Sequence, residues 1–268
     1  MDFCAAHESE GKAEHSAECG EKLALRAVLA SSAAFPELDY GPFVRLSNAV
    51  SHYRVYRSYG FRLWDIPRHG SQHSSDRFLE PTGQNVFAVL RNWSLQRETR
   101  PRFQFVVEGL REAFAGFEEF DFEQAGTTVT VAVHRAGGRR LPIAQESTGF
   151  LVALLHLTAI ASTEPGTAMA IDQIEDSLHP EMIRCLLDRA RRWASRHDLR
   201  ILLATHSPVV LDALRDEPDH VFVMQPGAPT LPVRVDEMFA PDWLAQFSLG
   251  SLYTGRDFGA PEAPADAG

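Results

Sequence analysis

Cysteine is scarce in this sequence. Of its 268 residues only Cys4, Cys19 and Cys185 are cysteines, and none stands at a spacing typical of metal ligands. Three thiols are also too few for the disulfide framework of a small secreted protein. The first residues show no basic stretch followed by an apolar segment, so they indicate no secretory signal. We therefore expect a protein of the reducing cytoplasm.

Long hydrophobic runs and excess positive charge are missing as well. The longest apolar stretch, residues 150–161, contains His156 and is much shorter than the ~20 residues that span a bilayer. It predicts a core helix, and we expect no membrane contact. The formal net charge of -10 should repel nucleic acid unless a local basic patch overrides it. The arginines of residues 53–63 and 184–200 could form such a patch, but solvated surface positions explain them better, so nucleic-acid binding has no support.

The composition, with 44% hydrophobic and 23% charged residues, is ordinary for a globular protein. Residues 1–21 and 259–268 read as disordered tails. Residues 22–143 predict helices and antiparallel strands, whereas residues 144–258 predict alternating helices and strands. The expected fold class is α/β, with a mostly parallel sheet flanked by helices and an antiparallel α+β front portion. The expected helices lie at residues 22–32, 42–53, 85–95, 103–117, 150–161, 208–214 and 237–247. The expected strands lie at residues 120–124, 127–133, 139–143, 220–224 and 231–235, whereas residues 68–84 are expected to form a loop.

Residues 168–208 organise the chain. Two short apolar runs stop abruptly at polar residues, Asp172 in the first and Thr205 in the second. Between them, Pro180 opens an amphipathic helix. A strand, helix, strand unit with a right-handed crossover makes its strands parallel, and ligands bind at the carboxyl edge of such sheets. Asp172 and His206 should therefore lie near each other at one edge.

The residues at these strand ends suit a Mg-nucleotide site. Asp172 offers a hard anionic oxygen for Mg²⁺. Gln173 stands where a carboxylate would take a proton from the attacking water; an amide orients water but cannot accept the proton. His206 is placed to touch a γ-phosphate. Ser207 is better explained as the N-cap of the helix that starts at Pro208.

A second candidate site precedes the apolar helix. Ser147, Thr148 and Gly149 stand where backbone N–H groups and a hydroxyl could bind an anion. A simple helix cap explains the same residues equally well.

The order of these motifs resembles the ABC-type branch of P-loop ATPases. Ser-x-Gly comes before an apolar helix, followed by a strand with Asp-Gln-Ile-Glu-Asp-Ser-Leu-His-Pro and a strand with Thr-His-Ser-Pro. Within that branch the chain is similar to the AAA-type ATPase domains related to the OLD, RecF and SMC proteins. The resemblance covers residues 78–259.

The resemblance implies a role for each matching position. Asp172 would be the Walker B aspartate on Mg²⁺, Gln173 would occupy the general-base position, and His206 would be the switch histidine. Ser177 and His179 would lie in the D-loop, and Ser147 and Gly149 would form the signature that reaches ATP on a second subunit. The implied cofactors are ATP and Mg²⁺, and the implied partner is a second subunit, in a homodimer or in a heterodimer with an intact ATPase.

Two departures from the family pattern bear on activity. No G-x-x-x-x-G-K-[ST] occurs in the sequence, and in the family that P-loop lies upstream of the signature, so the resemblance implies a chain that starts after it. Gln173 also removes the usual base, and such a loss costs about 10²- to 10⁴-fold in rate. We expect weak or no activity of the chain alone.

Three hypotheses follow from the sequence. The first is a truncated ABC-type ATPase that acts through nucleotide-dependent dimerisation in nucleic-acid maintenance or phage defence. The second is a non-catalytic partner or scaffold that lends Ser147 to the ATP of an intact subunit. The third, a metal hydrolase using Asp172, Glu175, His179 and His206, is disfavoured because no helical histidine pair presets the ligand geometry.

Overall fold

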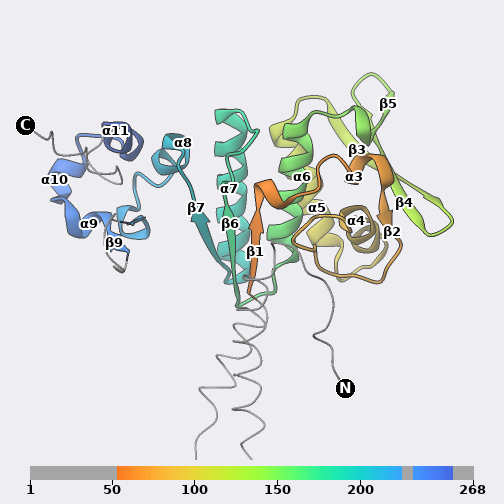
Figure 1. Cartoon of the computed structure of the whole chain (residues 1–268), viewed down its shortest axis with the longest axis horizontal. Coiled ribbons are helices and arrows are strands. Elements are labelled where there is room, and N and C mark those ends of the chain that lie inside the picture. The colour runs from red at the N-terminus through yellow and green to blue at the C-terminus, as the bar shows by residue number, and fades with distance from the viewer. Residues whose placement is uncertain (1–52, 225–231, 256–268) are drawn as a thin grey trace, which may run out of the picture.

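A parallel sheet of three strands lies at the centre of the computed structural model, which describes residues 53–224 and 232–255 (Figure 1). In spatial order the strands are β1 (Arg54–Arg57), β6 (Ala168–Asp172) and β7 (Arg200–Ala204). Arg57 pairs with Asp172, and Asp172 pairs with Ala204, so all three carboxyl ends lie at one edge. The expected strand, helix, strand unit with parallel strands is confirmed.

Helix α7 (Pro180–His197) forms the crossover between β6 and β7. Pro180 occupies the first turn, and Nδ1 of His179 accepts a hydrogen bond from the N–H of Glu181 at 3.3 Å. The helix ends at Asp198, which adopts the left-handed conformation with φ 52°. Its apolar stripe, from Ile183 to Trp193, is buried against the rest of the core.

Helix α6 (Thr148–Ser162) is the innermost helix. Every residue from Phe150 to Ser162 is buried, as a helix that is apolar on all sides requires. It packs against α4 (Val86–Leu95), α5 (Arg100–Ala113) and α7. Within the described ranges no helix combines the length and the apolar character needed to traverse a lipid bilayer.

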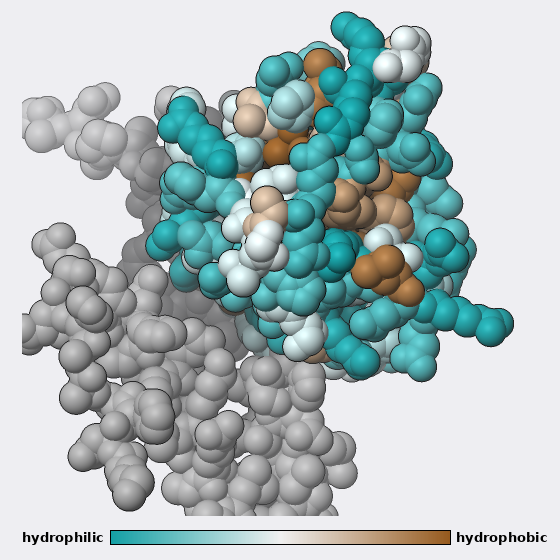
Figure 2. Space-filling view, turned by 90° about the vertical axis from the view of Figure 1, so that its right-hand side faces the viewer, coloured by the Kyte–Doolittle hydropathy of each residue, from teal (hydrophilic) through white to brown (hydrophobic). Residues whose placement is uncertain are grey.

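The front portion of the chain folds as an antiparallel sheet. It consists of β2 (Ser71–Gln72), β3 (Phe117–Ala125), β4 (Thr128–Arg135) and β5 (Arg139–Pro142). Strand β4 pairs with each of the other three. Phe114, Phe117 and Phe120 place their rings 5.1, 5.4 and 6.4 Å from the ring of Phe150, so this sheet packs onto α6. The face shown in Figure 2 is largely hydrophilic, with smaller hydrophobic patches among the polar side chains.

The last elements form a smaller unit on the other side of the parallel sheet (Figure 1). They are α8 (Pro208–Asp212), β8 (Phe222–Val223), β9 (Val233–Arg234), α9 (Val235–Met238), α10 (Pro241–Leu244) and α11 (Leu249–Thr254). This unit has its own core, built from Leu211, Val221, Val223, Val235, Leu244, Leu249 and Leu252. The described residues thus form two hydrophobic clusters.

Several expected elements need correction. The single helix expected at residues 237–247 is two short helices, because Pro241 cannot continue a helix from the preceding turn and starts α10 instead. Helix α11 was not expected; the hydroxyl of Ser248 caps it by accepting from the N–H of Ser251 at 3.1 Å. Residues 68–84 contain the end of α3 (Ile66–His69) and β2 rather than loop alone.

Other boundaries shift without changing the pattern. Helix α5 begins at Arg100, three residues before the expected start, because Pro101 fits its first turn. Some expected elements lie outside the described residues. They are the two tails, the helix at residues 22–32 and nearly all of the helix at residues 42–53.

Arg189 joins α5 to α7 from a nearly buried position, with 8% of its surface exposed. Its guanidinium donates to the backbone oxygen of Phe105 at 2.9 Å and to the carboxylates of Glu112 and Glu108, both at 2.7 Å. A methyl group on Gly109 would lie 2.8 Å from Cδ of Arg189, so a larger residue there would force this side chain to shift.

We expect Arg189→Ala to lower the free energy of unfolding by about 2 to 3 kcal/mol, because it orphans a buried carbonyl and separates two packed helices. Urea unfolding followed by circular dichroism measures this. Arg192→Ala is the matched control: Arg192 lies on the same helix and contacts the same Glu112 at 3.3 Å, but its side chain is 61% exposed. Such a pair contributes at most about 1 kcal/mol. Equal losses in the two variants would contradict the structural role of Arg189.

Candidate functional site

The candidate site lies where β6 and β7 end. Asp172 is the last residue of β6, Gln173 follows it, and His206 follows β7 after Thr205. Asp172 and Gln173 are half-buried, whereas His206 is exposed. The expectation that the ends carrying Asp172 and His206 share one edge of the sheet is therefore confirmed.

The backbone of Gln173 is held on both sides. Its N–H donates to the carbonyl of Ala204 at 2.9 Å, and its own carbonyl accepts from the hydroxyl of Ser58 at 2.5 Å and from the N–H of Asp176 at 3.2 Å. Gln173 adopts a positive φ of 59°, which a residue with a side chain takes only where its surroundings impose it. The structure thus fixes the direction in which the chain leaves β6.

Glu175 connects the two loops that follow the strands. Its Oε1 accepts from the hydroxyl of Thr205 at 2.7 Å and from the N–H of His206 at 3.0 Å. Its Oε2 is buried and has no hydrogen-bond partner among the described residues. The sequence had suggested Glu175 only as a metal ligand, and its link to Thr205 and His206 was missed.

Ser207 does not cap α8 as expected. It occupies the N-cap position, but its side chain makes no capping hydrogen bond. Instead the hydroxyl of Thr205 accepts from the N–H of Ser207 at 3.0 Å. Thr205 satisfies this donor because Glu175 already orients its hydroxyl.

A residue from the last helix reaches the histidine. Nδ1 of His206 lies 3.0 Å from the hydroxyl oxygen of Tyr253 in α11. Helix α11 is anchored nearby, since Asp212 accepts from the N–H of Gly250 at 2.7 Å. A methyl group on Gly250 would lie 2.5 Å from the carbonyl oxygen of Pro208, so this close docking needs glycine. The unit that sequence analysis did not associate with the site thus contributes Tyr253 to it.

Negative charge accumulates at this edge. Burial, and next the carboxylates of Glu175 and Asp172, raise the pKa of Asp176 above its ordinary value. A cation would relieve this repulsion. Among the described residues, however, no group of three or more His, Cys, Asp or Glu side chains could hold a metal ion by itself.

These donors fit Mg²⁺ shared with a nucleotide better than a metal held by protein alone. Mg²⁺ keeps several waters and commonly takes only one or two carboxylates together with phosphate oxygens. The metal-hydrolase hypothesis finds no support, because His179 caps α7 and Nδ1 of His206 contacts Tyr253.

The start of α6 forms the second candidate site. The hydroxyl of exposed Ser147 accepts from the N–H of Phe150 at 3.2 Å, so of the two explanations that the sequence left open, the helix cap is present. A methyl group on Gly149 would lie 2.8 Å from the carbonyl oxygen of Ser177, which itself has a positive φ of 61°. The beginning of α6 and the loop after β6 are thus in contact.

An ion pair fixes the residue before Ser147. Glu146 and Arg135 in β4 form two hydrogen bonds, one of them from Nε to Oε1 at 3.0 Å, and the Glu146 side chain is only 5% exposed. The same guanidinium lies 5.5 Å from the ring centroid of Phe150. The antiparallel sheet therefore holds the start of α6 in place.

A family model described as "AAA domain, putative AbiEii toxin, Type IV TA system" matches residues 29–212. The chain belongs to this family of AAA domains. The P-loop ATPase domain that the motif order predicted is thereby confirmed. A search of the curated proteins finds no match.

Two solved structures are similar to parts of this AAA domain. One is titled "Crystal structure of the SmcHead bound to the C-winged helix domain of ScpA"; it is 13% identical, with a TM-score of 0.41 over 65% of this chain and 55% of that chain. The other is an Smc head domain with an extended coiled coil, bound to the C-terminal domain of ScpA, derived from Pyrococcus furiosus. It is 10% identical, with a TM-score of 0.34 over 75% of this chain and 46% of that chain. The AAA domain thus spans about half the length of the solved structures that it matches.

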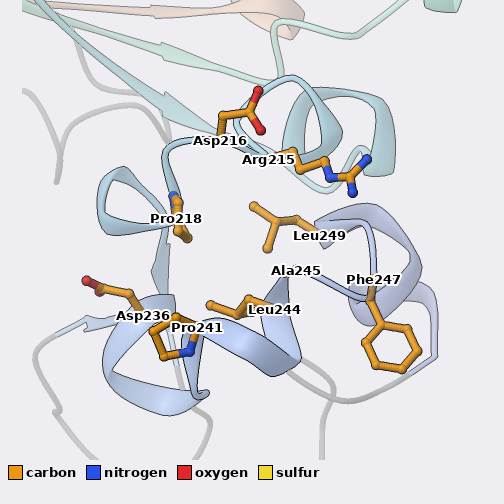
Figure 3. Close-up of a pocket in the computed structure, with 9 residues that line it drawn as sticks. All are labelled: Arg215, Asp216, Pro218, Asp236, Pro241, Leu244, Ala245, Phe247 and Leu249. Carbon is orange, nitrogen blue, oxygen red and sulfur yellow. The ribbon is translucent and has the colours of Figure 1, made fainter.

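A pocket of about 280 Å³ lies in the C-terminal unit, outside the residues that the family model matches (Figure 3). Pro218, Leu244 and Leu249 face it, whereas the charged ends of Arg215 and Asp216 point outward. It lacks the converging polar groups that mark a binding site, and none of the expected site residues lines it. The strand ends remain the candidate site.

The raised pKa of Asp176 predicts a pH-dependent gain from Asp176→Asn. The folded state favours the protonated carboxyl group of Asp176. At pH values above the pKa that Asp176 has in the folded protein, the ionised group therefore lowers the free energy of unfolding. This penalty disappears as the pH falls to the pKa that Asp176 has in the unfolded chain. The substitution should therefore raise the free energy of unfolding at pH 7, and the gain should vanish near pH 4.

Urea unfolding at the two pH values measures this difference. Asp188→Asn, at an exposed position of α7, is the control for removing a negative charge from a chain that is already acidic. A gain for Asp176→Asn that is the same at both pH values would contradict the raised pKa of Asp176.

Proposed function

We propose that these residues form the signature and Walker B part of an ABC-type ATPase that works as a nucleotide-dependent dimer. The observation that carries the proposal is the shared edge of β6 and β7, which presents Asp172 and His206 together. The contact between Gly149 and Ser177 supports it, because it joins the signature position to the loop after β6. One surface could thus serve two bound nucleotides.

Each residue has a role that suits its position. Asp172 holds Mg²⁺ through its carboxylate, Gln173 orients the attacking water, and His206 donates a hydrogen bond to the γ-phosphate. Bound Mg-ATP would supply the phosphoryl group, and phosphate oxygens and water would complete the coordination of Mg²⁺. In such a reaction the protein contributes mainly positioning and charge stabilisation.

Ser147 and Gly149 act on a nucleotide held by the second subunit. The hydroxyl of Ser147 and the N–H groups at the start of α6 meet its γ-phosphate, a favourable arrangement at the positive end of a helix. Ser177 and His179 lie in the loop that faces the partner. Both residues are exposed, as this role requires.

The phosphate cradle comes from residues outside these 268. No G-x-x-x-x-G-K-[ST] is present, so neither the glycine-rich backbone nor the lysine that holds the β- and γ-phosphates is available here. We propose that a P-loop on another part of the assembly supplies them. We therefore expect these 268 residues alone to bind Mg-ATP with millimolar rather than micromolar affinity.

The biological setting that we propose is phage defence or nucleic-acid maintenance. The description of the matching family, which names a putative AbiEii toxin and a type IV TA system, supports defence. The alternative is a partner that lends Ser147 to an intact ATPase without hydrolysing ATP itself. Gln173 favours this alternative, because an amide cannot act as the general base.

Ser147→Arg should abolish nucleotide-dependent pairing, because a bulky cation at the start of α6 blocks the approach of the second nucleotide. Sedimentation velocity with and without millimolar Mg²⁺ and a non-hydrolysable ATP analogue measures the dimer fraction. Ser195→Arg, on the exposed face of α7, introduces the same side chain away from the proposed interface. Nucleotide-dependent pairing that survives Ser147→Arg would leave Ser147 as a helix cap only, and pairing in neither protein would contradict a homodimer.

Gln173→Glu should restore the missing base and raise phosphate release at millimolar Mg-ATP, by up to about 10²-fold if the site hydrolyses ATP. Gln96→Glu, at an exposed position after α4, controls for added negative charge. Unchanged turnover for Gln173→Glu would favour the non-catalytic partner.

A further inference from the structure

A polar pair lies in the core directly beneath the candidate site. His156 sits in the middle of the apolar helix α6 and has 0% of its surface exposed. Its Nε2 lies 3.1 Å from the hydroxyl oxygen of Ser58, which is 3% exposed and follows β1. Burying a polar imidazole at the centre of an apolar helix costs free energy unless it forms a hydrogen bond, and Ser58 is the partner for that bond.

The hydrogen bonds assign the protons of this pair. Ser58 has a single hydroxyl proton, and the nearest acceptor is the carbonyl of Gln173 at 2.5 Å, followed by the carbonyl of Asp172 at 3.3 Å. The hydroxyl oxygen must then accept from the N–H at Nε2 of His156. Nδ1 consequently carries no proton, and it has no partner among the described residues.

The ring keeps this arrangement over a wide pH range. Burial lowers the pKa of His156 to about 3, so the imidazole is neutral at neutral pH. Phe61 packs against it edge-on, with ring centroids 5.4 Å apart. The donor at Nε2 is thus held by packing on one side and by Ser58 on the other.

We propose that Ser58 and His156 are positioning residues that hold the Asp172–Gln173 segment in its working conformation. Gln173 has a positive φ, and hydrogen bonds hold its backbone on both sides. Its N–H donates to the carbonyl of Ala204, and its carbonyl accepts from the hydroxyl of Ser58. Losing the second bond frees the backbone to relax away from the left-handed conformation. The carboxylate of Asp172 and the amide of Gln173 then lose their fixed relative orientation.

This pair also couples α6 to the end of β6. Helix α6 contacts the segment after β6 at two points, through Gly149 against Ser177 and through His156 by way of Ser58. The role of Ser58 and His156 in catalysis rests on the proposed function, whereas their effect on the backbone of Gln173 does not.

Hydrogen exchange of the full chain without nucleotide tests the hold directly. Ser58→Ala should raise the exchange of the protected amides of Gln173 and Asp176 by about tenfold. His156→Leu should do the same, whereas His156→Gln, which can still donate a hydrogen bond toward Ser58, should stay close to the wild type. Exchange in His156→Gln equal to that in His156→Leu would overturn the donor role of His156.

Ser71→Ala is the matched control. Ser71 is 1% exposed, donates to the carbonyl of Gln84 at 2.6 Å and accepts from the N–H of Phe87 at 3.0 Å, all away from the candidate site. It should speed exchange near residues 71–87 but not at residues 173–178. If Ser58→Ala affects residues 173–178 no more than Ser71→Ala does, the proposal is wrong.

A second measurement separates positioning from stability. Under the conditions that support ATP hydrolysis, Ser58→Ala should lower kcat and leave KM unchanged, whereas Ser71→Ala should change neither. An equal fall of kcat in both variants would mean a general loss of stability and would overturn the positioning role. Because the exchange experiment needs no nucleotide, altered exchange without ATP hydrolysis or nucleotide-dependent pairing would contradict the homodimeric ATPase and leave the structural hold intact.

Discussion

The parallel pairing of β6 with β7 is the constraint on which the candidate site depends. Asp172 and His206 are separated by a whole helix in sequence, yet the register that sets Asp172 against Ala204 brings both strand ends to one edge. Parallel strands need a crossover, and α7 provides it while burying its apolar stripe. The polar residues of the site can lie at the edge because the sheet beneath them is held by packing elsewhere.

Helix α6 positions residues of both candidate sites. Its buried length is fixed to the antiparallel sheet by aromatic contacts and by the Arg135–Glu146 pair, which leaves Ser147 exposed at its start. His156, in its middle, reaches the segment after β6 through Ser58. One rigid element therefore positions an exposed serine and the backbone of Gln173 together, as a pre-organised site requires.

Much of the fold followed from periodicity and from prolines and glycines. Local interactions decide several features that the sequence predicted well. They are the apolar helix α6, the start of α7 at Pro180 and the turn between β4 and β5 at Gly137 and Gly138. The C-terminal unit was harder to predict. Its helices have four to six residues, too few to show a period, and they are stabilised mainly by a shared core, which a sequence window does not contain.

The chemical groups at the ends of β6 and β7 could be read from the sequence, because abrupt apolar runs and the order of motifs are local properties of the chain. The contacts that hold those groups became visible only in the folded structure. Ser58 meets Gln173 across 115 positions, Glu175 meets Thr205 across 30, and Tyr253 meets His206 across 47. Hydrogen bonds of this kind depend on how separate elements pack, and no spacing within one segment encodes that packing.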